Sequence, residues 1–136
     1  MRIVLDTNCL LMAISDRSRY HKVWREFIES GYTLCVTNDI IEEYVEVIGR
    51  NISERATEAV AYLILTRSNV LYLDPHFRFH LVEADPDDNK FVDCAIAAGA
   101  KNLASEDHHF DKLKDIPFPH VDVISIEQFL IELKQH

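Results

Sequence analysis

The sequence predicts an α/β fold with three layers, α/β/α, in which a mostly parallel central sheet lies between helices; we expect a single domain over residues 1–136. Short aliphatic or β-branched runs alternate with segments of helical periodicity, which is typical of parallel sheets covered on both faces. A length of 136 residues with 48% hydrophobic composition suits one domain with a substantial core. Three glycines and four prolines leave little sequence for an interdomain linker.

The expected strands are short apolar runs that stop at turn-forming residues or at an acid. In chain order they cover residues 3–5, 33–37, 70–74, 102–105 and 122–125. The expected helices carry apolar residues at spacings of three and four, and capping residues mark several of their starts. In chain order they cover residues 9–14, 20–29, 38–50, 53–67, 86–100 and 126–134. Ser53 is the expected cap of the fourth helix, and Ser125 opens a capping box with Gln128.

Composition restricts the class of protein. A net charge of −9 argues against holding nucleic acid by the overall field of the protein, since phosphate binding relies on Lys and Arg. Cations bound at acidic side chains would offset this charge locally. No apolar run approaches the roughly 18 residues of a membrane helix, and the N-terminus lacks the apolar segment of a signal peptide. The three cysteines lie far apart in apolar contexts, so we expect buried thiols in a reducing cytoplasm.

Four carboxylates stand where the expected strands and helices meet. Asp6 and Asp107 follow the first and fourth strands, and Glu43 and Asp88 lie near the starts of two helices. Because ligands of parallel α/β sheets lie beyond the carboxyl ends of the strands, we expect these side chains to converge there. Acids that gather without a basic partner disfavour folding but suit a cation. Hard oxygen donors with no His or Cys among them favour Mg²⁺ or Mn²⁺.

Three glutamates compete for the acidic position on the third expected helix. Glu46 lies opposite the apolar arc of the helical wheel, and Glu42 can form a capping box with Asp39. Glu43 lies on the edge of the apolar arc and faces partly inward. The wheel therefore favours Glu43 as the inward-facing acid.

Asp88 and Asp93 compete for the acidic position on the fifth expected helix. Asp88 shares the stripe of apolar residues that lie three, four and seven positions later, where a carboxylate needs a partner. It also suits the first turn of a helix capped by Asp85, just as Asp6 suits the cap of its own helix. Capping and metal binding can coexist. Asp93 is displaced from Asp88 by more than a third of a turn and stays open as a flanking candidate.

Four segments resemble, in the same order, the four motifs of the PIN-domain nucleases. They are Val-Leu-Asp6-Thr-Asn, Ile-Glu-Glu43-Tyr, Asp88-Asn-Lys-Phe before an Ala-rich helix, and Ser105-Glu-Asp107. The resemblance covers nearly the whole chain, and the acidic run before the Ala-rich helix is most similar to bacterial toxin components of toxin–antitoxin pairs. Ser105 stands where the family usually carries Thr, which keeps a hydroxyl. Both Asp88 and Asp93 fit the third motif, and the interval to the fourth favours Asp88.

The resemblance implies metal-dependent hydrolysis of single-stranded RNA. The implied ligands of Mg²⁺ or Mn²⁺ are Asp6, Glu43, Asp88 and Asp107. Asp93, Asn8 and Ser105 are the implied accessory residues, with Asn8 and Ser105 orienting carboxylates or water by hydrogen bonds. The implied partners are a cognate antitoxin protein and a second copy of the chain in a homodimer, with no membrane association.

Substrate contacts are expected from the few basic residues. Lys90 lies near the acids, while Arg17 and Arg19 belong to a basic cluster that includes aromatic residues and could contact phosphates. The alternative for this cluster is a solvated helix face. A second function also stays open, namely a catalytically idle scaffold that binds RNA or a partner protein. A phospho-accepting signalling domain is disfavoured, because Asp6 lacks an adjacent acid.

Overall fold

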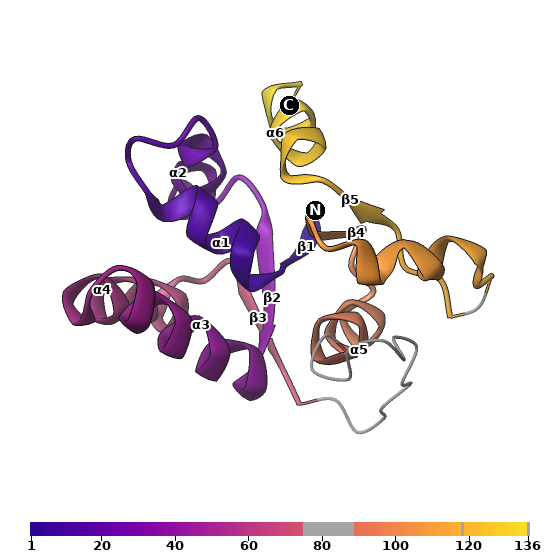
Figure 1. Ribbon diagram of the computed structural model, residues 1–136, viewed down its shortest axis with the longest axis horizontal. Helices are drawn as coiled ribbons and strands as arrows, with labels where there is room; N and C mark the ends of the chain where they lie inside the picture. Colours follow the sequence, from indigo (N-terminus) through magenta and orange to yellow (C-terminus); the bar gives the residue numbers. More distant parts are fainter. Residues whose placement is uncertain (75–88, 118, 136) are drawn as a thin grey trace.

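In the computed structural model, which describes residues 1–74, 89–117 and 119–135, helices flank a central sheet (Figure 1). Within these residues the sheet contains five strands, all parallel, in the order β3-β2-β1-β4-β5. Their bounds are Arg2–Leu5 (β1), Thr33–Thr37 (β2), Val70–Leu73 (β3), Asn102–Ala104 (β4) and Val123–Ile124 (β5). The predicted α/β class with a mostly parallel sheet is confirmed.

The register of the central strands places two site residues side by side. Leu5 of β1 is level with Ala104 of β4. The pairing continues past the strand ends, because the Asp6 amide donates to the Ala104 carbonyl over 3.0 Å and the Ser105 amide to the Ile124 carbonyl over 2.9 Å. Asp6 and Ser105 therefore leave neighbouring strands at the same edge of the sheet.

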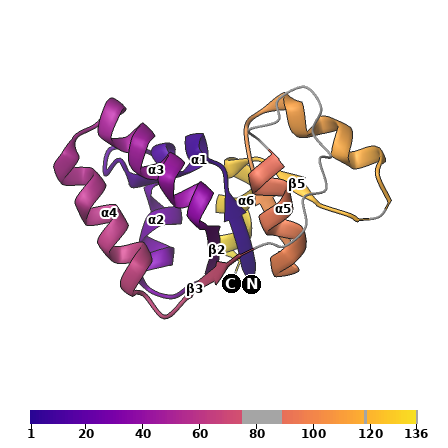
Figure 2. The ribbon, with the colours of Figure 1, turned by 90° about the horizontal axis from the view of Figure 1, so that it is seen from below.

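The helices form layers on the two faces of the sheet. Helices α1 to α4 lie on one side and α5 on the other (Figures 1 and 2), and α6 packs against α2. Their bounds are Thr7–Ile14 (α1), His21–Ile28 (α2), Asn38–Asn51 (α3), Glu54–Thr66 (α4), Asn89–Ala98 (α5) and Ile126–Lys134 (α6). A 3₁₀ helix, η2 (His108–Asp115), joins β4 to β5 and was not predicted. None of the described helices is long and apolar enough to cross a membrane.

Side-chain caps set the starts of several helices. Ser53 accepts from the Ala56 amide and Ser125 from the Gln128 amide, both over 3.0 Å, which confirms these two caps. The predicted capping box of Asp39 with Glu42 is wrong, because Thr37 caps α3 instead. Thr37 is the last residue of β2 and still has extended backbone, so its hydroxyl can accept from the Ile40 amide over 3.2 Å. The helix consequently begins at Asn38.

The core lies between the sheet and its covering helices. Its largest fully buried side chains include Tyr44, Phe27, Phe91, Phe110 and Phe129. The three cysteines are buried and free, as the sequence predicted. The Tyr44 hydroxyl donates to the carbonyl of Leu5, so α3 is tied to the end of β1 immediately before Asp6. This bond crosses the core from a helix to the backbone that presents the site.

Candidate active site

Asp6 lies at the carboxyl end of β1 and caps the helix that follows. Its backbone is extended, and Oδ1 accepts from the Cys9 amide over 2.8 Å. The other oxygen, Oδ2, accepts from the Ser105 hydroxyl. The cap leaves α1 starting at Thr7, two residues earlier than predicted. Capping and a place at the candidate site therefore coexist in one side chain.

The surroundings of Asp6 are unfavourable for a negative charge. The residue is only 6% exposed, and burial raises the pKa of its carboxyl group. The nearby charge of Asp107 raises this pKa further, while the hydrogen bonds from Ser105 and Cys9 lower it. Both groups that hydrogen-bond to Asp6 are neutral. A bound cation would stabilise the ionised form at this position.

Asp107 joins Asp6 through the hydroxyl of Ser105. The Asp107 amide donates to the Ser105 hydroxyl over 2.9 Å, and that hydroxyl in turn donates to Asp6. The Asp107 carboxylate accepts from the His109 amide over 2.8 Å and so caps η2. Ser105 is itself buried, at 6% exposure. We name Asp6 and Asp107, together with the Ser105 hydroxyl that joins them, the aspartate pair.

Glu43 lies on α3 and is held through both of its carboxylate oxygens. The Thr7 hydroxyl donates to Oε2, and the Lys90 ammonium pairs with Oε1 at 2.6 Å. The side chain of Glu43 is 28% exposed, whereas Glu42 and Glu46 are exposed, as the wheel predicted. The expectation that the acids gather without a basic partner is wrong for Glu43. Lys90 approaches it from α5, a contact between helices that are far apart in the sequence.

Thr7 is the residue at this site that sequence reasoning missed. Its side chain is buried, at 6% exposure, and it connects Glu43 to the residue next to Asp6. Asn8, the predicted orienting residue, has an exposed side chain. The available signal was helical phase: Thr7 begins a helix whose buried side also carries Leu10, three residues later. The hydroxyl of Thr7, rather than the amide of Asn8, orients a carboxylate in this structure.

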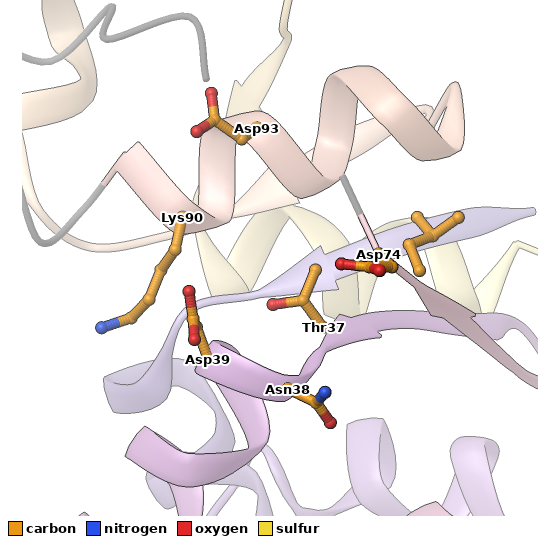
Figure 3. A pocket seen from close by; sticks show the side chains of 7 residues that line it. Thr37, Asn38, Asp39, Asp74, Lys90 and Asp93 are labelled. Carbon is orange, nitrogen blue, oxygen red and sulfur yellow. The ribbon is translucent and has the colours of Figure 1, made fainter. Parts of the chain in front are cut away.

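The two candidates for the third acid differ in what the structure describes. Asp88 lies outside the described residues. Asp93 is described and buried at 3% exposure, on α5. It lines a pocket of ≈140 Å³ together with Lys90 and with residues from the carboxyl ends of β2 and β3 (Figure 3). The other lining residues are Thr37, Asn38, Asp39, Leu73 and Asp74.

The basic residues proposed as substrate contacts do not lie together. Lys90 is at Glu43. Arg17 and Arg19 follow the far end of α1, a helix of eight residues and thus roughly 12 Å long, and both are exposed. Arg19 pairs with Glu127 of α6 at 3.0 Å. Their exposure agrees with the alternative interpretation of this cluster, a solvated face of the protein.

The donor set fits a hard divalent cation, although the carboxylates do not converge fully. Among residues 1–74, 89–117 and 119–135, no three His, Cys, Asp or Glu side chains are placed to hold a metal ion together. The aspartate pair nevertheless offers carboxylate oxygens beside a buried aspartate with neutral partners. Glu43 would complete such a site once Lys90 leaves its oxygen. The chemistry of the donors therefore suits Mg²⁺ or Mn²⁺.

Comparison with known proteins gives a family and a fold. A family model described as PIN domain matches residues 2–109. No curated protein matches the chain in sequence. Among solved structures, the chain is similar to VapC20 of Mycobacterium tuberculosis, a toxin that cleaves the sarcin–ricin loop. The identity is 16%, the TM-score is 0.59, and the match covers 84% of this chain and 95% of the other.

Two further similar structures are complexes of proteins with DNA. VapBC2 from Rickettsia felis, bound to a DNA fragment from its promoter, has a TM-score of 0.62 and 15% identity over 92% of this chain and 100% of that one. DNA-bound VapBC from Salmonella typhimurium has a TM-score of 0.57 and 14% identity over 93% and 98%. At such identities the likeness is evidence for the fold alone.

Proposed function

Because this chain belongs to the PIN-domain family, we propose that it is a divalent-metal-dependent ribonuclease that hydrolyses single-stranded RNA as the toxin of a toxin–antitoxin pair. The observation that carries the proposal is the aspartate pair beside Glu43, at the carboxyl edge of a parallel sheet. Ligands bind at this edge in open α/β folds. The solved structures of the same fold include a toxin that cleaves the sarcin–ricin loop.

The side chains have distinct parts in the proposed reaction. Hydrolysis joins a water oxygen to phosphorus while one bridging P–O bond breaks. When bound, Mg²⁺ or Mn²⁺ would supply charge neutralisation at the phosphodiester and activation of the attacking water. Asp6, Glu43 and Asp107 would hold the ion through carboxylate oxygens, together with Asp88 or Asp93. Ser105 keeps the aspartate pair in register by accepting from one residue and donating to the other.

Burial gives Asp6 a second part in the proposed mechanism. Its raised pKa shows that the folded protein disfavours the ionised carboxylate in the absence of a cation. A divalent cation bound at Asp6 would supply the positive charge that the neutral hydrogen-bond donors Cys9 and Ser105 do not. Glu43 differs, because Lys90 already offsets its charge.

Cleavage of a single-stranded RNA, measured with Mn²⁺ or Mg²⁺ and then with a chelator, tests the proposal. We expect cleavage by the wild type only with the metal, and its loss in Asp6→Asn and Glu43→Gln. Glu42→Gln is the matched control, because Glu42 precedes Glu43 on the same helix but is exposed. Equal cleavage by all these proteins, or cleavage unaffected by the chelator, would contradict the proposal.

The same assay distinguishes the two candidates for the third acid. We propose Asp88 as the ligand and Asp93 as an accessory residue, on the basis of their spacing to Asp107. Asp88→Asn should then abolish cleavage, while Asp93→Asn should reduce it. The reverse order would assign Asp93 as the ligand, and its position in the pocket beside Lys90 is compatible with that outcome.

We also propose a small antitoxin protein as the partner and a homodimer as the assembly. VapBC2 and VapBC share this fold. The net charge of −9 favours a basic segment in the partner. Co-purification with the product of the neighbouring reading frame, with inhibition of RNA cleavage, tests the first part. Light scattering of the isolated protein tests the second, and a monomer mass would contradict it.

A further inference from the structure

Lys90 and Glu43 form the closest ion pair described between different helices. The Lys90 Nζ and the Glu43 Oε1 are 2.6 Å apart, and the side chains are 19% and 28% exposed. The four other described pairs of a Lys or Arg with a Glu are longer, such as Lys101 with Glu132 at 3.8 Å. A pair that is shielded from solvent on this scale interacts more strongly than an exposed one. Lys90 therefore contributes a held positive charge at the proposed metal ligand.

The geometry of Glu43 leaves no free carboxylate oxygen for a new ligand. Oε2 accepts from the Thr7 hydroxyl, and Oε1 is occupied by Lys90. A hydroxyl is neutral and can remain beside a metal-bound carboxylate. An ammonium group at contact distance is different, because its positive charge repels a divalent cation that approaches the same oxygen. Metal binding through Oε1 consequently requires Lys90 to move.

Lys90 also borders a pocket whose lining contains acidic residues. Lys90 is one of the residues that line the pocket of ≈140 Å³, together with Asp39, Asp74 and Asp93, although the Asp93 side chain points away from Lys90 (Figure 3). Lysine carries its charge on a flexible four-carbon stem with rotatable donors, so it can change partners without movement of its helix. The pocket lies between the start of α5 and the ends of β2 and β3.

We propose that Lys90 is a positioning residue: it pairs with Oε1 of Glu43 in the metal-free protein, competes with the divalent cation for that oxygen, and leaves it when the cation binds. This inference rests on the proposed metal-dependent function. Lys90 keeps Glu43 oriented toward the site through the ion pair while Thr7 fixes the other oxygen. The pair also lowers the affinity of the empty site for cations.

Titration with Mn²⁺, in which electron paramagnetic resonance detects the free ion, tests the competition. A unit charge at contact distance in a partly exposed site should alter cation affinity by about tenfold. We therefore expect Lys90→Met to lower the Mn²⁺ dissociation constant by about tenfold, and Lys90→Arg, which keeps the charge, to stay near the wild type. Lys101→Met is the matched control, because it removes another Lys–Glu pair away from the site.

A double-mutant cycle identifies Glu43 as the point of competition. In Glu43→Gln, the further change Lys90→Met should no longer tighten Mn²⁺ binding, because the shared oxygen has lost its charge. If the wild type binds Mn²⁺ and Lys90→Met binds it no more tightly, the proposal for Lys90 is overturned while the metal site stands. Absence of Mn²⁺ binding by both the wild type and Lys90→Met would overturn the metal site itself, and this inference with it.

A measurement on the unaltered protein covers the case in which Lys90→Met fails to fold. Nuclear magnetic resonance of the ¹⁵N-labelled lysine ammonium groups follows Lys90 directly during a Mg²⁺ titration. The Lys90 signal should shift with the same saturation as the backbone amide of Cys9, which donates to Asp6. A shift at Cys9 with no change at Lys90 would show that the cation binds without displacing Lys90, and would refute the proposal.

Discussion

Asp6→Asn is expected to stabilise the metal-free protein, because the fold buries a carboxylate whose hydrogen-bond partners are neutral. An asparagine at this position can keep both bonds. Its Oδ1 would accept from the Cys9 amide, and Asn is as good a helix cap as Asp. Its Nδ2 would donate to the Ser105 hydroxyl, which would give up its present role as donor. The substitution therefore removes the charge and leaves the contacts.

The sign of the effect and its pH dependence follow from the raised pKa of Asp6. Burial, and to a lesser extent the charge of Asp107, raises this pKa above its usual value, so the folded protein binds the proton more tightly than the unfolded chain does. The resulting stability is complete below the unfolded pKa and is lost as the pH rises through the folded pKa. We expect Asp6→Asn to raise the free energy of unfolding at neutral pH, within the range of about 0.5–2 kcal/mol that single stabilising substitutions commonly give.

Urea denaturation in the presence of a chelator, followed by circular dichroism, measures this effect. The gain should be present at about pH 7 and should shrink as the pH falls through the raised pKa of folded Asp6 toward about 4, the usual pKa of an aspartate. Asp16→Asn is the control, because it also removes one negative charge from a net charge of −9 but acts at an exposed residue. The reasoning is refuted if Asp6→Asn is no more stable than Asp16→Asn, or if its gain is the same at both pH values.

Two further substitutions test the supports of the site. Tyr44→Phe removes the hydroxyl that donates to the buried Leu5 carbonyl, so we expect a loss of about 1–3 kcal/mol in urea denaturation; an unchanged midpoint would show that this bond contributes nothing. Ser105→Ala removes the hydroxyl that joins the two aspartates, and we expect RNA cleavage to fall by about 10- to 100-fold. Ser105→Thr keeps the hydroxyl and should retain most activity, whereas equal loss in both variants would count against this role.

The sequence predicted much of the framework because its signals are local. Apolar runs and helical spacing located five strands and six helices, and hydroxyl side chains marked the starts of α4 and α6. One incorrect prediction, the cap of α3, arose because two neighbouring residues compete for the same position. Asp39 and Thr37 both suit a helix cap, and the structure selected Thr37, since the extended end of β2 brings its hydroxyl to the Ile40 amide.

The candidate site was predicted in its residue types but not in its contacts. Glu43 was favoured over its neighbours by helical phase, which depends only on spacing along one helix. No such rule could identify Lys90 as its partner, because the two residues are 47 positions apart and meet only when α5 packs near α3. The same limit hid Thr7, whose hydroxyl reaches Glu43 across 36 positions.

By itself, the sequence determined which carboxylates stand at strand ends and helix starts, because those positions depend on backbone hydrogen bonding and side-chain periodicity over a few residues. Only the tertiary structure decided how these carboxylates are partnered. Register between β1 and β4 brings Ser105 to Asp6 across 99 positions, and the packing of α5 brings Lys90 to Glu43. Burial and neighbouring charge then decide that Asp6 has only neutral hydrogen-bond partners, whereas Glu43 is paired with the ammonium group of Lys90. These quantities depend on distances in space, which local sequence patterns do not contain.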